Sequence, residues 1–366
     1  MRVADIIALF EHYAPVSYQE SYDNSGLQVG DPNARITGAL LTLDITEAVV
    51  QEAINHNCNL IIAHHPLIFS GLKRLTGSNY VQRIAELAIR NNINLFAVHT
   101  NLDNMRRGVN ERIANRLGLK DTRVLAPISG KLLKLYTYVP LSHATAVREA
   151  LFAAGAGHIG AYSECSFSTA GTGSFRGDDS TQPFIGQAGG AREEVSEEKI
   201  EVILPAHLQN RVLQALKNAH PYEELAYELV ALQNANQETG AGLIGKLEHP
   251  VPESEFLELL KKQMKASVIR HTRLLDRPVQ RVAVCGGSGS FLLPDALRAG
   301  ADVFVSADFK YHQFFDAEEK IIIADIGHYE TEQFTVEIFA TILKENNVNF
   351  AVLLSTEITN PVKYLY

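Results

Sequence analysis

Cysteine is scarce in this sequence of 366 residues, which contains only Cys58, Cys165 and Cys285. Three widely spaced cysteines form neither a disulfide framework nor a cysteine-rich zinc site. A chain without such a framework is typical of a reducing compartment, so we expect a cytoplasmic protein.

Long apolar runs and concentrated basic charge are also missing. No apolar stretch approaches the ~18–20 residues of a membrane-spanning helix, and the opening segment MRVADIIALFEHYAP has the pattern of an amphipathic helix rather than a signal peptide. The net charge of −9 provides no electrostatic attraction to nucleic acid. We therefore expect neither a membrane nor a nucleic-acid partner. An anionic substrate is compatible with this charge, because a metal ion supplies positive charge locally.

Apolar strand-like segments alternate with amphipathic helix-like segments at both ends of the chain. The pattern runs through residues 1–126 and returns over residues 239–366. Such alternation is typical of a mostly parallel sheet that is flanked by helices on both faces. The sequence therefore predicts an α/β fold with a duplicated core, whose two halves share one layout.

The middle of the chain has a different pattern. Residues 129–238 give the order strand, helix, strand, strand, helix, strand, which is that of a ferredoxin-like α+β unit. Turn-like sequences flank this region. We therefore predict an inserted domain at 129–238 that divides the α/β core into 1–126 and 239–366.

Histidine and aspartate residues follow the predicted core strands. They are Asp44, His64, His65, His99, Asp103, Asp308, His312, Asp325 and His328. In parallel α/β sheets, ligands bind outside the carboxyl ends of the strands. Imidazole and carboxylate together suit zinc, iron, manganese or cobalt. This composition predicts a metal site at the rim of the core.

The pair His64–His65 stands where an apolar strand stops, directly before Pro66. Neighbouring residues on a regular strand point to opposite faces. At a strand end, however, the backbone bends, so both rings can face one rim and serve two metal ions. The alternative is one core histidine and one surface histidine. The ligand-type residues at matching strand ends favour the metal site.

Asp103 follows His99 by four residues in the segment HTNLD. A carboxylate can bridge two cations through its two oxygens. The neighbouring Asn101 and Asn104 leave a plain turn as the alternative interpretation of this segment.

His328 and Glu332 stand four residues apart in DIGHYETE, at the start of a predicted helix. This spacing places both side chains on one helix face, within reach of one metal centre. Favourable interaction with the helix dipole is an alternative explanation for the glutamates, but it does not account for His328.

Three further segments permit a binding role without requiring one. CGGSGS follows a predicted strand and could receive an anion, yet it lacks the spacing and the lysine of a P-loop, so a tight turn is favoured. In the middle region, TAGTGSFRG is rich in glycine and HPYEE is rich in polar groups. Each segment is compatible with ligand binding, and also with a plain loop or a subunit contact.

Several motifs in one order resemble a known family. DNSGLQVG, AHHPLIF, VHTNLD, SADFKYH and DIGHYETE are similar to those of the GTP cyclohydrolase 1 type 2 homolog family, also called the Nif-three-like family. GTGSF and HPYEELAYELV are similar to the version with an inserted domain of the PII/CutA type. The resemblance implies two divalent metal ions per chain, a toroidal homohexamer, and these metal ligands: His64, His65, Asp103, His328 and Glu332.

A metal-dependent hydrolase is the function that we expect from these features. Two cations activate a bridging water, and His99 and His312 are candidates for orienting groups or for proton transfer. The resemblance implies a small nucleotide-like or cyclic amide substrate. The alternative is a metal-binding regulatory scaffold whose inserted domain senses a small ligand.

Overall fold

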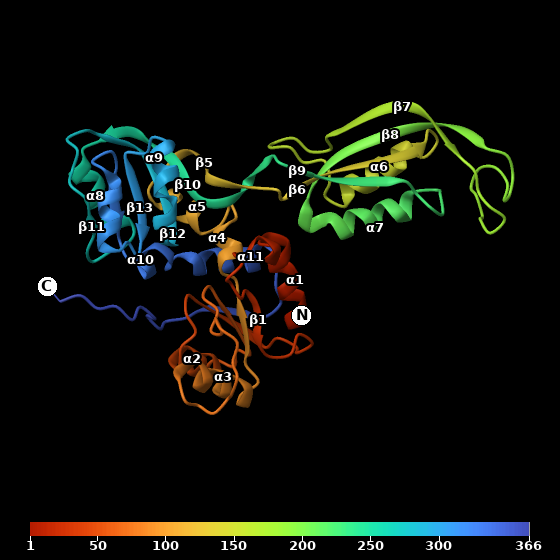
Figure 1. Ribbon diagram of the computed structural model, residues 1–366. Helices are drawn as coiled ribbons and strands as arrows, with labels where there is room; N and C mark the ends of the chain where they lie inside the picture. Colours follow the sequence, from red (N-terminus) through yellow and green to blue (C-terminus); the bar gives the residue numbers. More distant parts are fainter. Residues whose placement is uncertain (366) are drawn as a thin grey trace. The chain divides into compact units, whose positions relative to one another are not determined.

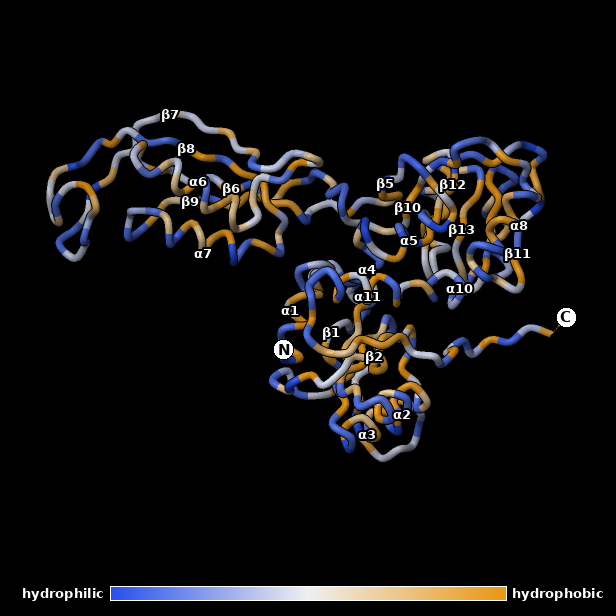
Figure 2. The backbone as a smooth tube through the Cα atoms, turned by 180° about the vertical axis from the view of Figure 1, so that it is seen from behind, coloured by the Kyte–Doolittle hydropathy of each residue, from blue (hydrophilic) through white to orange (hydrophobic). Residues whose placement is uncertain are grey.

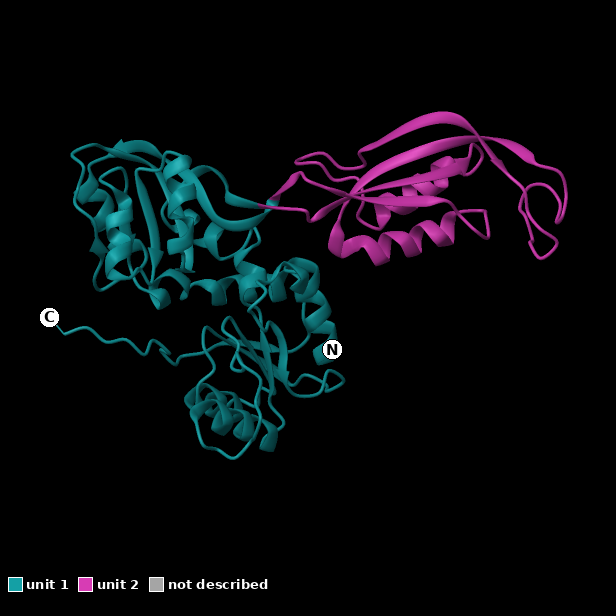
Figure 3. Ribbon diagram, viewed as in Figure 1, with its two compact units in different colours: residues 1–127, 238–366 teal, residues 128–237 magenta. Residues whose placement is uncertain are grey.

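The computed structural model describes residues 1–365, and the chain divides into two compact units (Figures 1 and 3). Unit 1 combines Met1–Pro127 with the segment from Glu238 onward, and unit 2 is Ile128–Gln237. The boundaries predicted from the sequence are 126, 129, 238 and 239.

The first sheet of unit 1 has the strand order β1-β4-β3-β2-β15. Its strands are β1 (Gly26–Val29), β2 (Gly38–Thr42), β3 (Leu60–Ala63), β4 (Asn94–Ala97) and β15 (Ala351–Leu354). Strands β15, β2, β3 and β4 pair in parallel, whereas β1 is antiparallel to β4. Every residue of β2, β3 and β4 is buried, as the continuous apolar runs predict for strands covered on both faces.

Helices cover both faces of this first sheet. On one face, α2 (Glu47–Asn55) and α3 (Tyr80–Arg90) share a core with Leu40 and Ile61. On the other face, α1 (Val3–Tyr13) and α11 (Thr335–Glu345) pack against Leu41 and Ile62. Alternate strand residues thus enter different cores, because successive side chains of a strand point to opposite faces.

The second sheet of unit 1 has the order β11-β14-β13-β12-β10-β5. Its strands are β5 (Lys120–Ser129), β10 (Ala235–Val251), β11 (Arg270–His271), β12 (Val279–Ser288), β13 (Val303–Ala307) and β14 (Ile322–Asp325). Strands β12, β13 and β14 are parallel, while β10 pairs antiparallel with β12 and β11 pairs antiparallel with β14. This sheet is therefore mixed, and the prediction of mostly parallel sheets holds only for the first. The glycines and polar residues of β10 resemble a turn in the sequence, although they form a long strand.

Each half of the chain gives a strand to the sheet of the other half. Strand β15 comes last in the sequence but pairs with β2 of the first sheet. Strand β5 belongs to the N-terminal half and lies at the edge of the second sheet. The two halves are thus interlinked rather than two independent copies of one layout.

The remaining helical segments of unit 1 are short, and the longest of them spans Glu253–Gln263. They are η1 (Val16–Tyr18), α4 (Thr100–Asp103), α5 (Val109–Arg116), α8 (Glu253–Gln263), η3 (Ser290–Leu292), α9 (Leu293–Arg298), η4 (Tyr311–Ala317) and α10 (His328–Glu332). None of the helices within residues 1–365 has the length and apolar character to cross a membrane.

Side chains cap the starts of α2 and α3. Thr46 caps α2, where its hydroxyl accepts a hydrogen bond from the N–H of Val49 at 3.2 Å. Asn79 caps α3 by accepting from the N–H of Gln82. The hydroxyl of Ser78, one residue earlier, donates to the side chain of Gln82 at 3.0 Å.

Unit 2 contains one four-stranded antiparallel sheet in the order β7-β8-β6-β9. Its elements are β6 (Leu132–Pro140), α6 (Ala144–Ala153), β7 (Ser166–Phe175), β8 (Glu193–Pro205), η2 (Ala206–Leu208), α7 (Gln209–Ala219) and β9 (Tyr227–Leu232). This is the strand and helix order that the sequence predicts. Figure 2 shows alternating hydrophilic and hydrophobic colour along α7, which is amphipathic.

The two helices of unit 2 pack on one face of its sheet. Leu135, Ile200 and Val202 enter the core that α6 and α7 complete. Residues of the opposite strand parity, among them Tyr138 and Glu197, therefore point to the face that the helices leave uncovered.

Phe10 joins three parts of unit 1 and offers a test of its packing. Its ring is 1% exposed and makes edge contacts with Phe96 and Phe339, at centroid distances of 5.7 and 5.6 Å. Phe10→Ala should cost ~3–5 kcal/mol of stability through lost burial and a cavity. Phe315→Ala, at a position 66% exposed, should change stability by at most ~0.5 kcal/mol. Thermal unfolding followed by circular dichroism compares them, and equal melting temperatures would contradict this packing.

Candidate metal centre

His64 and His65 lie just after β3, and both rings face the same space. His64 is fully buried, and its Nδ1 lies 2.9 Å from the carbonyl oxygen of Val98. The Nδ1 of His65 lies 2.7 Å from Oδ1 of Asp44. Because each Nδ1 already has a hydrogen-bond partner, the Nε2 atom of each ring is the nitrogen that can bind a metal ion. The ring centroids are 5.0 Å apart, so the strand-end bend brings both rings to one rim.

Glu332 lies among three of the predicted histidines. Its Oε2 is 3.0 Å from Nε2 of His65 and 3.1 Å from Nε2 of His328, and its Oε1 is 3.8 Å from Nε2 of His64. The two Nε2 atoms of His65 and His328 are 3.3 Å apart, although the residues stand far apart in the sequence. Helix α10 presents His328 and Glu332 on one face, as their spacing predicts.

Asp103 completes the group from α4, where HTNLD forms a short helix rather than a plain turn. Its Oδ1 lies 3.5 Å from Nε2 of His64. All five predicted ligands therefore converge. The carboxylate between the histidines, however, is that of Glu332 and not that of Asp103.

Three atoms of this cluster are buried without a hydrogen-bond partner among the described residues: His64 Nε2, Asp103 Oδ1 and Glu332 Oε2. An unsatisfied buried polar atom costs ~1–3 kcal/mol, and more when it is charged. A cation held between these atoms would satisfy them. Ligand atoms within 4.8 Å of one another form three sets: His64, Asp103 and Glu332; His65, His328 and Glu332; and His64, His65 and His99.

Electrostatics differ sharply between the two adjacent histidines. Burial lowers the pKa of His64 to about 4, so its imidazole is neutral and free to act as a ligand. Burial also acts against charge on His65, but the neighbouring carboxylates of Asp44 and Glu332 outweigh it and raise the pKa to about 10. The pKa of His328 rises to about 11, because Glu332 and Asp308 outweigh its burial. Imidazolium charge thus balances the carboxylates when no cation does.

A second layer of carboxylates orients the rings. Asp44 bonds Nδ1 of His65, and Asp308 lies 2.6 Å from Nδ1 of His328. Asp23 lies 2.7 Å from Nδ1 of His99. Such carboxylate–histidine pairs fix the ring orientation at metal sites. In the sequence, Asp44 and Asp308 stand out only as strand-end residues, and the role of Asp23 was not predicted because no local pattern links it to His99.

The two histidines expected to assist catalysis lie in different surroundings. The ring centroid of His99 is 5.2 Å from that of His64 and 5.3 Å from that of His65. His312 is exposed on η4, where its ring contacts are with Tyr311 and Phe315. The fold thus brings His99 to the cluster and leaves His312 outside it, so a role for His312 at this centre has no geometric support.

Asp325, the other strand-end aspartate, is buried at the end of β14. Its carboxylate bonds Arg270 and accepts from the N–H of Phe309 at 3.0 Å. Its contacts indicate a structural role rather than a ligand.

The CGGSGS segment forms the backbone wall behind the cluster. Gly287 has φ of +60°, and a Cβ there would lie 2.4 Å from Oε1 of Glu332. The N–H of Gly286 donates to Asn110 and that of Gly287 donates to Thr331, both at 2.9 Å. These two amides are therefore occupied, which favours the tight-turn interpretation over an anion cradle at them.

A cavity of about 360 Å³ opens onto the cluster. His65, His99, Asp103, His328 and Glu332 contribute to its wall. The aromatic side chains of Tyr22, Phe69 and Phe291 also line it, and each is at least half exposed. A space of this size accepts a small molecule beside the candidate ligands.

The C-terminal segment connects the two sides of the cluster. The hydroxyl of Thr359 donates to Oδ2 of Asp44 at 2.5 Å, and Oδ1 of Asp44 holds His65. The next residue, Asn360, donates to Oε1 of Glu330 at 3.0 Å, and Glu330 lies on α10. The chain end thus supports ligands from both halves of unit 1.

The family model of Duf34/NIF3 (NGG1p interacting factor 3) matches residues 1–361. The chain belongs to the Duf34/NIF3 family. Curated relatives include the GTP cyclohydrolase 1 type 2 homologs of Halalkalibacterium halodurans, 40% identical with all of both chains covered, and of Bacillus subtilis, 37% identical with 98% of each covered. The family resemblance inferred from the motifs is thereby confirmed.

Solved structures agree with this assignment. A Bacillus cereus protein related to NIF3 has a TM-score of 0.88 and 39% identity, over 100% of this chain and 99% of the other. A Staphylococcus aureus protein has a TM-score of 0.78 and 31% identity, again over 100% and 99%. The Duf34/NIF3 fold, including a middle region, is thus shared along the whole chain.

Gly287 provides a test of how closely the backbone approaches the ligands. Gly287→Ala should lower metal content, because the added Cβ displaces Glu332. Gly118→Ala is the matched control: Gly118 has φ of +70°, and a Cβ there would meet no atom within 4 Å. Both variants carry the same backbone strain, of about 1–2 kcal/mol. Elemental analysis of the two proteins should therefore differ, and equal metal loss would contradict the steric explanation.

Thr359 provides a test of the support from the chain end. Thr359→Val removes one hydrogen bond to Asp44 while it keeps the side-chain shape. Loss of such outer partners typically weakens metal affinity by about 10–100-fold. Competition with a chromophoric chelator measures the effect, and Thr341→Val, on the exposed side of α11, is the control. Unchanged affinity in Thr359→Val would show that the segment has no role in orienting His65.

Proposed function

We propose that this Duf34/NIF3 protein is a dinuclear metal-dependent hydrolase that acts on a nucleotide-like or cyclic amide substrate. Two ligand sets that share Glu332 define the two metal positions in this proposal. His64 and Asp103 would hold one cation with it, and His65 and His328 would hold the other. The observation that carries the proposal is the burial of His64 Nε2, Asp103 Oδ1 and Glu332 Oε2 without hydrogen-bond partners among the described residues.

The ligand atoms limit which metals can bind, and their number leaves coordination positions open for water or substrate. Imidazole nitrogens and carboxylate oxygens suit zinc, iron, manganese or cobalt. Five protein ligands do not fill two coordination spheres, and open positions are typical of catalytic rather than structural sites. Two such cations would lower the pKa of a bound water and stabilise developing negative charge on the substrate.

The residues around the cavity have roles of their own in this proposal. His99 lines the cavity, and Asp23 holds its Nδ1, so Nε2 is the nitrogen left to hold or move a proton. Asp44 and Asp308 keep His65 and His328 oriented. The aromatic side chains at the rim would position a flat substrate and reduce access of water.

The substrate class comes from the names of relatives. Several curated relatives at 34–40% identity are called GTP cyclohydrolase 1 type 2 homolog, which supports a nucleotide-like substrate. A toroidal homohexamer in the cytoplasm and a PII/CutA-like middle unit belong to the same proposal. The second candidate, a regulatory metal scaffold, is favoured by a separate cavity in unit 2.

Metal stoichiometry tests the centre. Protein purified without added metal or chelator should contain two ions per chain, and Glu332→Gln should lose most of both, because it removes the shared carboxylate. His312→Ala should keep them, since His312 lies outside the cluster. One ion per chain, or unchanged content in Glu332→Gln, would contradict the dinuclear site.

Turnover tests the reaction separately from metal binding. His99→Ala should retain metal but lose most hydrolysis of the best substrate in a screen of nucleotides, phosphoesters and cyclic amides. General acid–base groups typically contribute about 10²–10⁴-fold. Metal-loaded protein that turns over none of these compounds would exclude the hydrolase and leave the scaffold.

A further inference from the structure

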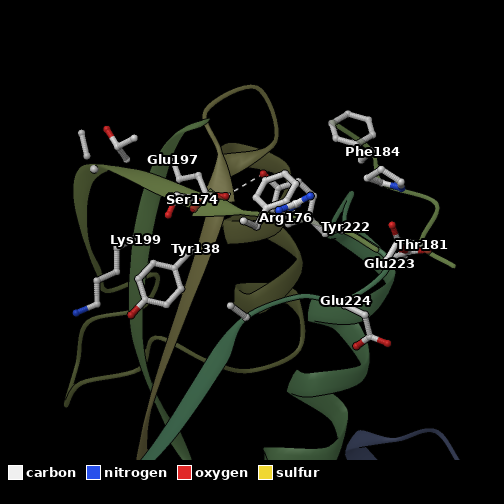
Figure 4. A pocket seen from close by; sticks show the side chains of 18 of the residues that line it. Tyr138, Ser174, Arg176, Thr181, Phe184, Glu197, Lys199, Tyr222, Glu223 and Glu224 are labelled. Atoms are coloured by element: carbon white, nitrogen blue, oxygen red, sulfur yellow. Dashed lines mark hydrogen bonds between the residues drawn. The ribbon is translucent and has the colours of Figure 1, made fainter. Parts of the chain in front are cut away.

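Unit 2 contains a cavity of about 650 Å³, lined only by residues between Tyr138 and Ala226 (Figure 4). It therefore belongs wholly to unit 2 and shares no residue with the metal centre. Its walls come from the glycine-rich segment of β7, from β8, and from residues 222–226. Its size lies within the range of small-molecule and cofactor sites, ~300–1,000 Å³.

The connection between β7 and β8 forms part of the wall. It runs from Arg176 to Arg192, which is longer than the ~12–15 residues beyond which irregular loops are uncommon in compact domains and are often functional. It brings Pro183 and Phe184 to the cavity. The N–H of Gln182 donates to Oε1 of Glu223 at 2.8 Å, which ties this loop to the HPYEE segment.

Glu197 is the polar group that marks this cavity as a binding site. It is only 8% exposed, on the sheet face that the helices of unit 2 leave uncovered. Its Oε1 accepts a hydrogen bond from the hydroxyl of Tyr222 at 2.9 Å, drawn as the dashed line in Figure 4. Among the described residues, no hydrogen bond to its Oε2 is present. The side chain of Glu197 is therefore largely buried, while its Oε2 stays accessible from the cavity to a ligand donor.

Glycine at position 173 makes room for this carboxylate. A Cβ on Gly173 would lie 2.1 Å from Oε2 of Glu197. Steric hindrance explains why glycine occupies position 173 in TAGTGSF. A larger residue there would push the carboxylate of Glu197 away from its place over β7. The glycine-rich strand and the buried acid therefore form one built arrangement.

His220 fixes the other side of the arrangement. Its Nε2 donates to the carbonyl of Tyr138 at 2.9 Å, and its Nδ1 accepts from the N–H of Tyr222 at 3.1 Å. Burial lowers the pKa of His220, so the neutral ring keeps both bonds. The HPYEE segment is thereby held against β6, and Tyr222 is positioned to orient Glu197.

Two aromatic rings lie next to Tyr222, the hydrogen-bond partner of Glu197. The ring of Tyr222 lies 5.8 Å from that of Phe175 and 6.4 Å from that of Phe184, centroid to centroid. Phe184 is 52% exposed, and Figure 4 shows it near the Tyr222 side of the cavity. Exposed aromatic faces next to a polar anchor are suited to stacking a flat ring.

Two basic side chains are also present. Arg176 and Lys199 line the cavity, although Lys199 is paired with Glu201 at 3.0 Å and Nε of Arg176 donates to the carbonyl of Gly190. They offer positive charge to an anionic substituent, while Glu197 requires donors. The cavity therefore combines an acceptor, aromatic walls and a cationic edge.

We propose that this cavity binds a planar nitrogen heterocycle that presents two adjacent N–H donors, the edge found on guanine and on pterins. The donors reach the carboxylate of Glu197, which accepts through four lone-pair positions and so serves the ligand as well as Tyr222. The ring lies against Phe184 and Tyr222. This is a second site, independent of the metal centre and of its reaction.

Isothermal titration calorimetry of the full-length protein tests the site. Guanosine is the first probe, because it lacks phosphates and so has little affinity for metal ions, and a pterin is the second. Adenosine is the mismatched probe, since its ring-nitrogen acceptor would face the carboxylate. Guanosine or the pterin should bind at least about tenfold more tightly than adenosine, because a site with a buried polar group rejects a ligand that leaves it unpaired. The stronger of the two distinguishes the source of the ring.

Variants locate the binding. Glu197→Gln should weaken guanosine or pterin binding by about tenfold or more, because the amide replaces one accepting oxygen with an NH2 donor and so cannot accept one N–H at each end of the group. Glu194→Gln is the matched control: it lies exposed on the same strand and does not line the cavity. Tyr222→Phe keeps the ring and removes only the hydroxyl that orients Glu197, so binding should fall by a few fold. This second variant tests the site if Glu197→Gln does not fold.

Three results would overturn the proposal. The first is equal affinity for adenosine and guanosine, and the second is unchanged binding in folded Glu197→Gln. The third is no detectable binding of guanosine or the pterin at millimolar concentration.

Discussion

The burial of Glu332 among His64, His65 and His328 is the constraint on which unit 1 depends. A carboxylate only 3% exposed is too costly to keep without compensating charge. The fold supplies that charge from histidines on two different parts of the chain, and a cation between them would supply it more completely. The surrounding backbone follows from this demand: Gly287 leaves room for the carboxylate, and the outer aspartates hold the rings.

The interlinked topology serves the same centre. His64 and His65 follow β3 of the first sheet, whereas His328 and Glu332 lie on α10, after β14 of the second sheet. Strand β15 then returns to the first sheet, and the segment beyond it reaches Asp44 and Glu330. Because ligands come from both halves, relative movement of the two sheets would separate them. The exchanged strands and the chain end restrict that movement.

Unit 2 also contains a buried carboxylate, but different groups surround it. Glu197 is also a buried carboxylate, but its partner is the hydroxyl of Tyr222 rather than a set of histidines. Both nitrogens of the nearby His220 ring are already hydrogen-bonded, to the carbonyl of Tyr138 and the N–H of Tyr222, so an organic donor is the better match for the second oxygen of Glu197. The two units thus present two buried acids with distinct chemistry, one suited to cations and the other to N–H donors.

The sequence by itself determined the α/β pattern, the element order of unit 2, and the residue types that meet at the rim, because strand and helix periodicities and ligand chemistry are local properties. It also indicated the family through the order of its motifs. Only the tertiary structure decided that the second sheet is mixed, that β15 joins the first sheet, and that Asp23 supports His99. It also placed Glu332 between the histidines and left His312 outside. These outcomes depend on which strands pair and which side chains meet across many residues of chain, and no local pattern encodes such long-range contacts.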